Sequence, residues 1–153
     1  MTRYASDTNV SVDRSQREIE NALRRFGANM FSSGWNLEPP AAYVQFRVGG
    51  RMVRILLALP RPEDSGFNRT PTGRHRTRDA AREAYEQEVR RRWRALSLTI
   101  KAKLVAVSEG ISTLEREFMA DIVLATQETL GEYITRHLGQ GPLALPSEIV
   151  GDQ

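Results

Sequence analysis

The stretch that decides the fold is residues 74–111, RHRTRDAAREAYEQEVRRRWRALSLTIKAKLVAVSEGI. Large apolar side chains recur in it at intervals of three or four residues, which is the period of one helix face. They are Tyr85, Val89, Trp93, Leu96, Ile100, Leu104, Val107 and Ile111. We therefore predict one long helix over residues 74–111, with this stripe as a main part of the core.

The clearest strand pattern lies at residues 42–59, where apolar and polar side chains alternate on both sides of Gly49-Gly50. A two-residue Gly-Gly loop suits a type I′ or II′ hairpin, which requires positive φ. The numbers of facing residues then add up to 99, which pairs Phe46 with Val53, Val44 with Ile55, Ala42 with Leu57, Arg47 with Met52, Gln45 with Arg54 and Tyr43 with Leu56. The hairpin is thus predicted to have one apolar face and one amphipathic face.

Two further elements are predicted before the hairpin. Ser15 and Glu18 have the spacing of a capping box, and Gly27 supplies a helix stop, so we expect a helix over residues 16–26. Residues 30–35 are expected to form a third strand, which Pro39-Pro40 ends because proline cannot donate to a β-ladder.

After Gly110 the apolar spacing predicts two short helices. Ser112 and Glu115 match a second capping box, followed by core positions at Leu114, Phe118, Ile122 and Met119. The last helix is expected to end at Gly139, after Leu130, Tyr133, Ile134 and Leu138. The chain is thus predicted to be α+β: a small antiparallel β-meander of about three strands packed by an N-terminal helix, one long central helix and short C-terminal helices. We expect a single domain over 1–138, a flexible basic loop at about 60–77 and a C-terminal tail over 139–153.

The composition is that of an ordinary globular protein, with 40% apolar and 27% charged residues among 153. No run of about 18 apolar residues is present, so we expect no membrane span. The first residues lack the apolar core of a signal peptide and cysteine is absent, so a cytoplasmic protein without disulfides is expected.

Charge is distributed unevenly along the chain. Residues 1–68 hold 9 basic and 7 acidic side chains, residues 69–107 hold 11 and 4, and residues 108–153 hold 2 and 8, which gives the net +3. A basic middle before an acidic end indicates either a polyanion site or two segments that neutralise each other. Some of the basic residues have an acidic residue four positions earlier, as in Glu86 with Arg90 and Glu88 with Arg92. A solvated, salt-bridged helix face is therefore an equal alternative to a polyanion site.

Catalytic and metal-binding patterns are weak. There is no cysteine nucleophile and no Gly-x-Ser-x-Gly elbow, and His75 and His137 both fit solvated positions. Glu115, Glu117 and Asp121 alone make a poor metal cluster. We therefore expect no cofactor and no metal, and an enzyme is the least favoured class.

The predicted nucleic-acid site combines the basic segment before the long helix, the polar side of that helix and the outer face of the hairpin. Its residues are Arg74, Arg76, Arg78, Arg82, Arg90, Arg91, Arg94, Lys101, Arg47, Arg54 and Tyr43. Arginine binds phosphate in a bidentate manner, and a tyrosine can stack on a base.

Residues 84–104, AYEQEVRRRWRALSLTIKAKL, resemble a family of small uncharacterised proteins encoded by tailed phages and prophages. Shorter runs share the resemblance across most of the chain: Tyr4-Ala5-Ser6, Val10-Ser11-Val12, Gly49-Gly50-Arg51 with Val53-Arg54, and residues 117–124. Residues 125–128 read Ala-Thr-Gln-Glu where the family tends to have a Pro-Asp-Gly turn, so a tight turn there lacks its usual residues. The resemblance implies a phage-derived accessory protein of the bacterial cytoplasm, and it brings no known activity.

Two hypotheses follow. The first is a non-enzymatic accessory protein that binds nucleic acid, DNA rather than RNA, through the basic segment and the helix face. The alternative is an interaction protein that inhibits a host protein or sequesters an anionic nucleotide as a homo-oligomer. A salt-dependent affinity for nucleic acid distinguishes the first from the second.

Overall fold

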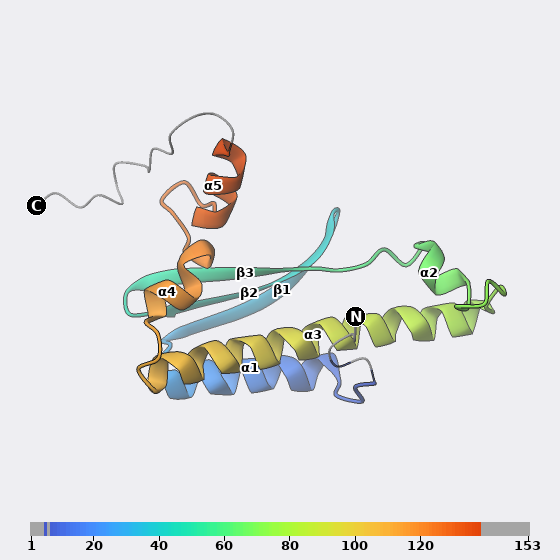
Figure 1. Ribbon diagram of the computed structural model, residues 1–153, viewed down its shortest axis with the longest axis horizontal. Helices are drawn as coiled ribbons and strands as arrows, with labels where there is room; N and C mark the ends of the chain where they lie inside the picture. The colour runs from blue at the N-terminus through green and yellow to red at the C-terminus, as the bar shows by residue number, and fades with distance from the viewer. Residues whose placement is uncertain (1–4, 6, 139–153) are drawn as a thin grey trace, which may run out of the picture.

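The computed structural model describes residue 5 and residues 7–138 (Figure 1). The helix stop predicted at Gly139, the tail over 139–153, and Tyr4 and Ser6 of the resemblance lie outside the described residues. Three strands form one antiparallel sheet in the order β1 (Met30–Leu37), β2 (Pro40–Val48) and β3 (Arg51–Ala58). Together with the long central helix, this sheet confirms the predicted α+β class.

The Gly49-Gly50 hairpin has the predicted register. Phe46 lies opposite Val53, Val44 opposite Ile55 and Ala42 opposite Leu57, with the polar pairs offset by one residue between them. Both glycines have positive φ, 56° and 74°, as a type I′ turn requires. The alternation places Ala42, Val44, Phe46 and Val48 in the core.

The long helix α3 spans Arg78–Ser108, four residues shorter at its start and three at its end than predicted. It begins at Arg78 because the Thr77 hydroxyl accepts a hydrogen bond from the Ala80 amide, which makes Thr77 the N-cap. The apolar stripe is buried at Trp93, Leu96, Ile100 and Leu104. Ile111 follows the helix and is 78% exposed, so its place in the stripe was predicted wrongly.

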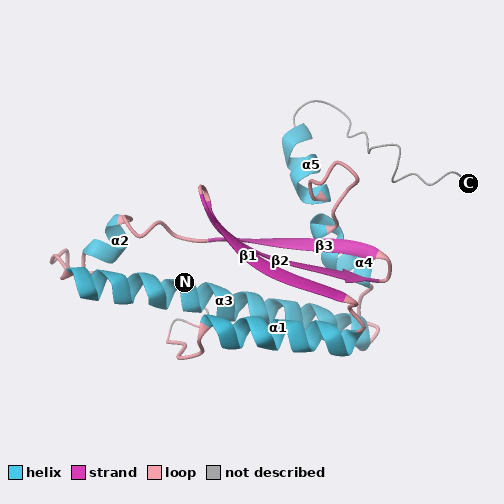
Figure 2. Ribbon diagram, turned by 180° about the vertical axis from the view of Figure 1, so that it is seen from behind, coloured by secondary structure: helices cyan, strands magenta, loops and turns pink. Residues whose placement is uncertain are grey.

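Helix α1 spans Val12–Phe26 and ends at Gly27, whose φ is 108°. The predicted capping box is wrong, because Ser11 is the N-cap and accepts from the Arg14 amide, while Ser15 is buried one turn inside the helix. Helices α1 and α3 run side by side in the same direction and cover one face of the sheet (Figures 1 and 2). The core lies between these two helices and that face.

The remaining helices are short: α2 (Ser65–Asn68), α4 (Leu114–Phe118), the 3₁₀-helix η1 (Met119–Asp121) and α5 (Leu130–His137). The second capping box was also misplaced, since Thr113 and not Ser112 caps α4. Phe118 is fully buried and meets the Phe46 ring edge-on, with 5.5 Å between ring centroids. Met119, by contrast, is half exposed.

The segment between η1 and α5 follows the edge of the sheet. The Val123 amide donates to the Met52 carbonyl at 2.9 Å and Ile122 bridges Val53, so this segment pairs beside β3 at the edge of the sheet. Residues 125–128 do form a turn despite their composition: the Leu124 amide donates to the Glu128 carbonyl, and Gln127 takes a φ of 70°. None of the helices in the described ranges is long and apolar enough to cross a membrane.

Candidate nucleic-acid interface

Part of the loop predicted at 60–77 lies at the N-terminal end of α3, beyond the end of the sheet (Figures 1 and 2). From here on the name basic loop means residues 65–78, which include α2 and the first residue of α3. The Phe67 ring of α2 packs edge-on against Tyr85 of α3, with 5.6 Å between centroids. The Arg76 guanidinium donates to the carbonyls of Gly66 and Phe67, each at 3.3 Å. These contacts fix the loop against one end of the long helix.

The centre of the basic loop is a small hydrogen-bonded turn. The Gly73 amide donates to the Thr70 carbonyl, and the Thr70 amide donates to the Arg74 carbonyl, both at 2.8 Å. Gly73 has a φ of 82°, a conformation that a side chain would disfavour. Arg69 and His75 face each other across this turn in an antiparallel bridge, so the arginines on its two sides are held close together.

The charge of the basic loop is of one sign. Its 14 residues contain Arg69, Arg74, Arg76 and Arg78 and no carboxylate. Arg74 and Arg78 are exposed, and neither forms an ion pair with any residue in the described part of the chain. The loop therefore presents cationic side chains that the described residues do not neutralise.

The predicted site residues further along α3 are engaged by carboxylates. Arg82 pairs with Asp79 at 3.2 Å, and Arg90 pairs with Glu83 at 3.2 Å. The spacing in the sequence had also allowed a pair between Arg90 and Glu86, which does not form in the described part of the chain. Arg91 pairs with Glu88 at 2.8 Å, and this hydrogen-bonded partner raises the pKa of Arg91 above its ordinary value. The salt-bridged helix face considered as the alternative is thus present along this part of α3.

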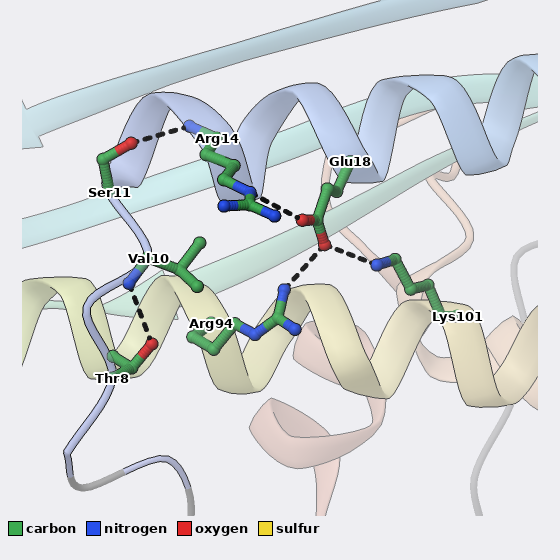
Figure 3. A network of polar contacts seen from close by, with 7 residues as sticks. All are labelled: Thr8, Val10, Ser11, Arg14, Glu18, Arg94 and Lys101. Atoms are coloured by element: carbon green, nitrogen blue, oxygen red, sulfur yellow. Dashed lines mark hydrogen bonds and ion pairs between the residues drawn. The ribbon is translucent and has the colours of Figure 1, made fainter.

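Arg94 and Lys101 hold the two long helices together (Figure 3). They approach the same oxygen of Glu18 in α1, at 2.6 Å and 2.5 Å, and Arg14 approaches the other oxygen at 3.3 Å. The hydrogen bond from Lys101, assisted by Arg94, lowers the pKa of Glu18 from 4.5 to about 2, although burial acts in the opposite direction. Both cations are therefore used within the fold.

The hairpin residues of the predicted site lie on a different surface. Tyr43, Arg47 and Arg54 alternate with the buried residues of β2 and β3, so they occupy the sheet face that α1 and α3 do not cover. Arg54 donates to the Gln45 side chain at 2.8 Å and to the Gln127 carbonyl at 2.9 Å. The Tyr43 ring lies against Gly34 of β1, where a Cβ would come within 2.5 Å of it. The structure does not bring these residues together with the basic loop.

One residue that sequence reasoning missed is Arg69, which precedes the segment chosen for the site. Arg69 lines a hollow of about 640 Å³ between the basic loop and α3, together with Arg76 and Arg91. Its guanidinium donates to the Gly73 carbonyl at 3.3 Å. The available signal was the acid-free composition of residues 65–78, which begins before Arg69 and not at Arg74.

The acidic residues considered for a metal do not converge. Glu115 pairs with Arg51 at 3.3 Å, and a hydrogen bond from its own main chain, with Arg51, lowers its pKa. Burial raises the pKa of Asp121, and Lys103 partly opposes that effect. Within the described residues, no group of three or more His, Cys, Asp or Glu side chains is arranged to hold a metal ion.

Comparisons of the chain with family models, with curated proteins and with solved structures give no match.

Proposed function

We propose that this protein is a non-enzymatic accessory protein that binds nucleic acid through the basic loop. We further propose that a phage or prophage encodes it and that it acts in the bacterial cytoplasm. One observation carries the binding proposal: four arginines and no carboxylate occupy residues 65–78. The resemblance of residues 84–104 to phage proteins supports the proposed origin.

The distribution of ion pairs supports the loop over the rest of α3 as the binding element. Arg82, Arg90 and Arg91 already have carboxylate partners, and a phosphate would have to compete with them. Arg74 and Arg78 are exposed and form no such pair with the described residues. A phosphate backbone that approaches this end of the molecule therefore meets arginines whose charge no carboxylate in the described part of the chain compensates.

The proposal predicts binding with a steep salt dependence and little sequence preference. Each duplex phosphate neutralised contributes a slope of about −0.9 to the plot of log affinity against log salt concentration. Fluorescently labelled duplex DNA, single-stranded DNA and RNA of equal length, titrated at several salt concentrations, would measure the slope and rank the three. DNA is expected to bind more tightly than RNA, and absence of binding at low salt would refute the proposal.

A matched pair of variants locates the interface. Arg74→Gln with Arg78→Gln removes two charges from the basic loop, and neither side chain makes an ion pair or a hydrogen bond with the described residues. Arg17→Gln with Arg25→Gln removes the same charge from exposed positions on α1. The first pair should reduce the salt slope by about 2 and the second by much less. An equal loss in both would mean that net charge, and not the loop, drives binding.

A further inference from the structure

The hollow between the basic loop and α3 has the size of a small-molecule site. Its volume of about 640 Å³ lies within the roughly 300–1,000 Å³ of typical ligand pockets. Arg69 and Arg76 contribute from the loop, Glu88 and Arg91 from α3, and Phe67 and Ala84 add apolar surface. Cationic and apolar groups thus face the same space.

Two arginines that line the hollow are anchored by main-chain carbonyls and keep N–H donors that these bonds do not use. Arg69 uses one terminal nitrogen to bond the Gly73 carbonyl, and Arg76 uses one to bond the carbonyls of Gly66 and Phe67. A guanidinium carries five N–H donors in a planar fork that matches two phosphate oxygens. Main-chain anchoring reduces the side-chain entropy that each arginine would lose on binding an anion.

The residues of α3 that line the hollow do not cancel the positive charge of Arg69 and Arg76. Among the described residues, Glu88 is the one carboxylate that lines the hollow, and it is 8% exposed. Arg91 binds it through two nitrogens, at 2.9 Å and 2.8 Å, and Arg92 binds it at 3.0 Å. A carboxylate shared by two guanidinium groups repels an incoming anion weakly, so the hollow as a whole favours negative charge.

We infer that this hollow binds a nucleoside phosphate. The phosphate would lie against Arg69 and Arg76, and the base would cover the apolar surface of Phe67 and Ala84. The inference deepens the proposed function, on which it rests, because the same basic loop supplies the arginines. The ligand has two possible sources, a free mononucleotide or the phosphorylated end of a nucleic-acid strand.

Nuclear magnetic resonance of the ¹⁵N-labelled protein tests the site directly. The deoxynucleoside monophosphates dAMP, dGMP, dCMP and dTMP are added separately at low salt up to about 5 mM, with deoxyadenosine and inorganic phosphate as partial ligands. At least one mononucleotide should shift the Gly66 and Gly73 amides, which line the hollow, more than either partial ligand does. The end-of-strand source is tested with a short oligonucleotide that carries or lacks a 5′-phosphate. If no mononucleotide and no 5′-phosphate shifts these amides, the inference is wrong.

Two variants separate the hollow from the rest of the loop. Ala84→Met fills the hollow without changing charge, and Ala102→Met makes the same change at an exposed position of α3 outside it. Ala84→Met should weaken nucleotide binding roughly tenfold and Ala102→Met should leave it unchanged. Should Ala84→Met fail to fold, Arg69→Gln is expected to give a similar loss, because it removes one phosphate fork.

The failure of this inference is distinguishable from the failure of the proposed function. If long DNA binds the native protein and Ala84→Met equally, and no mononucleotide shifts the Gly66 and Gly73 amides, the proposed interface stands and the hollow is not a nucleotide site. If Ala84→Met weakens nucleotide binding but the native protein binds neither DNA nor RNA at low salt, the hollow stands as a nucleotide site and the proposed interface is wrong. Nucleotide binding that is unaffected by both Ala84→Met and Arg69→Gln would overturn the assignment to this hollow.

Discussion

The contact between Glu18 and the two cations of α3 gives a stability prediction with a defined pH window. In Glu18→Gln the side chain keeps its size and loses its charge, so Arg94 and Lys101 face each other without a counter-ion. A decrease of the Glu18 pKa from 4.5 to about 2 corresponds to ~3 kcal/mol of stabilisation at neutral pH. The Glu18 side chain is 23% exposed, and solvent screening reduces the expected contribution to about 1–2 kcal/mol.

The sign of the pH dependence follows from the direction of the shift. Because folding lowers the pKa of Glu18, its contribution is complete above about 4.5 and is lost as pH falls from 4.5 towards 2. Urea denaturation of the native protein and of Glu18→Gln at pH 7, 4.5 and 3 measures this contribution as a difference in unfolding free energy. The difference should be about 1–2 kcal/mol at pH 7 and clearly smaller at pH 3.

A control on the same helix separates this clamp from an ordinary surface ion pair. Glu20 pairs with Arg24 of α1 itself, four residues along, and both side chains are more exposed than Glu18. Glu20→Gln should cost less than about 0.5 kcal/mol. The reasoning about Glu18 would be refuted if its substitution cost no more than that of Glu20, or if the cost were the same at pH 7 and pH 3.

Two further stability predictions concern the core. The Ser97 and Ser15 hydroxyls are fully buried and have no hydrogen-bond partner among the described residues. Ser97→Ala should therefore raise the free energy of unfolding, measured by urea denaturation, by about 0.5–1 kcal/mol. A loss of stability would contradict this prediction. Phe118→Ala removes a fully buried ring that packs on Phe46, so it should lower the free energy of unfolding by about 3 kcal/mol or more. Amide hydrogen exchange should increase in residues 114–124. A decrease below about 1 kcal/mol would show that α4 is not part of the core.

The parts of the fold that were predictable are those whose signal is local in sequence. Alternation around Gly49-Gly50 determined both strands and their register, because a slip of one residue would turn the whole apolar set out of the core. The caps were less predictable. Ser15 and Glu18 have capping-box spacing, yet Ser11 begins the helix and Glu18 binds cations of α3.

The arrangement of the candidate site residues was less predictable than the fold, because it depends on pairs that are distant in sequence. Arg94 and Lys101 were expected at a nucleic-acid interface, but their partner Glu18 lies 76 and 83 residues earlier in the chain. No spacing rule along a single helix reveals such a partner. The acid-free run 65–78 could have indicated Arg69, but its position beside Arg76 depends on the turn that pairs Arg69 with His75.

Helix α3 has two parts with different surroundings, since its buried residues begin at Glu88 and end at Leu104. The residues from Asp79 to Gln87 lie beside the basic loop, where Phe67 packs on Tyr85, and beside the segment before α1, where Gln87 donates to the Thr8 carbonyl at 3.0 Å. Substitutions there alter charge and shape at the loop without creating cavities in the core, so this end can diversify while the core sequence stays constrained. A single helix thus carries residues that stabilise the core at one end and residues of the proposed interface at the other.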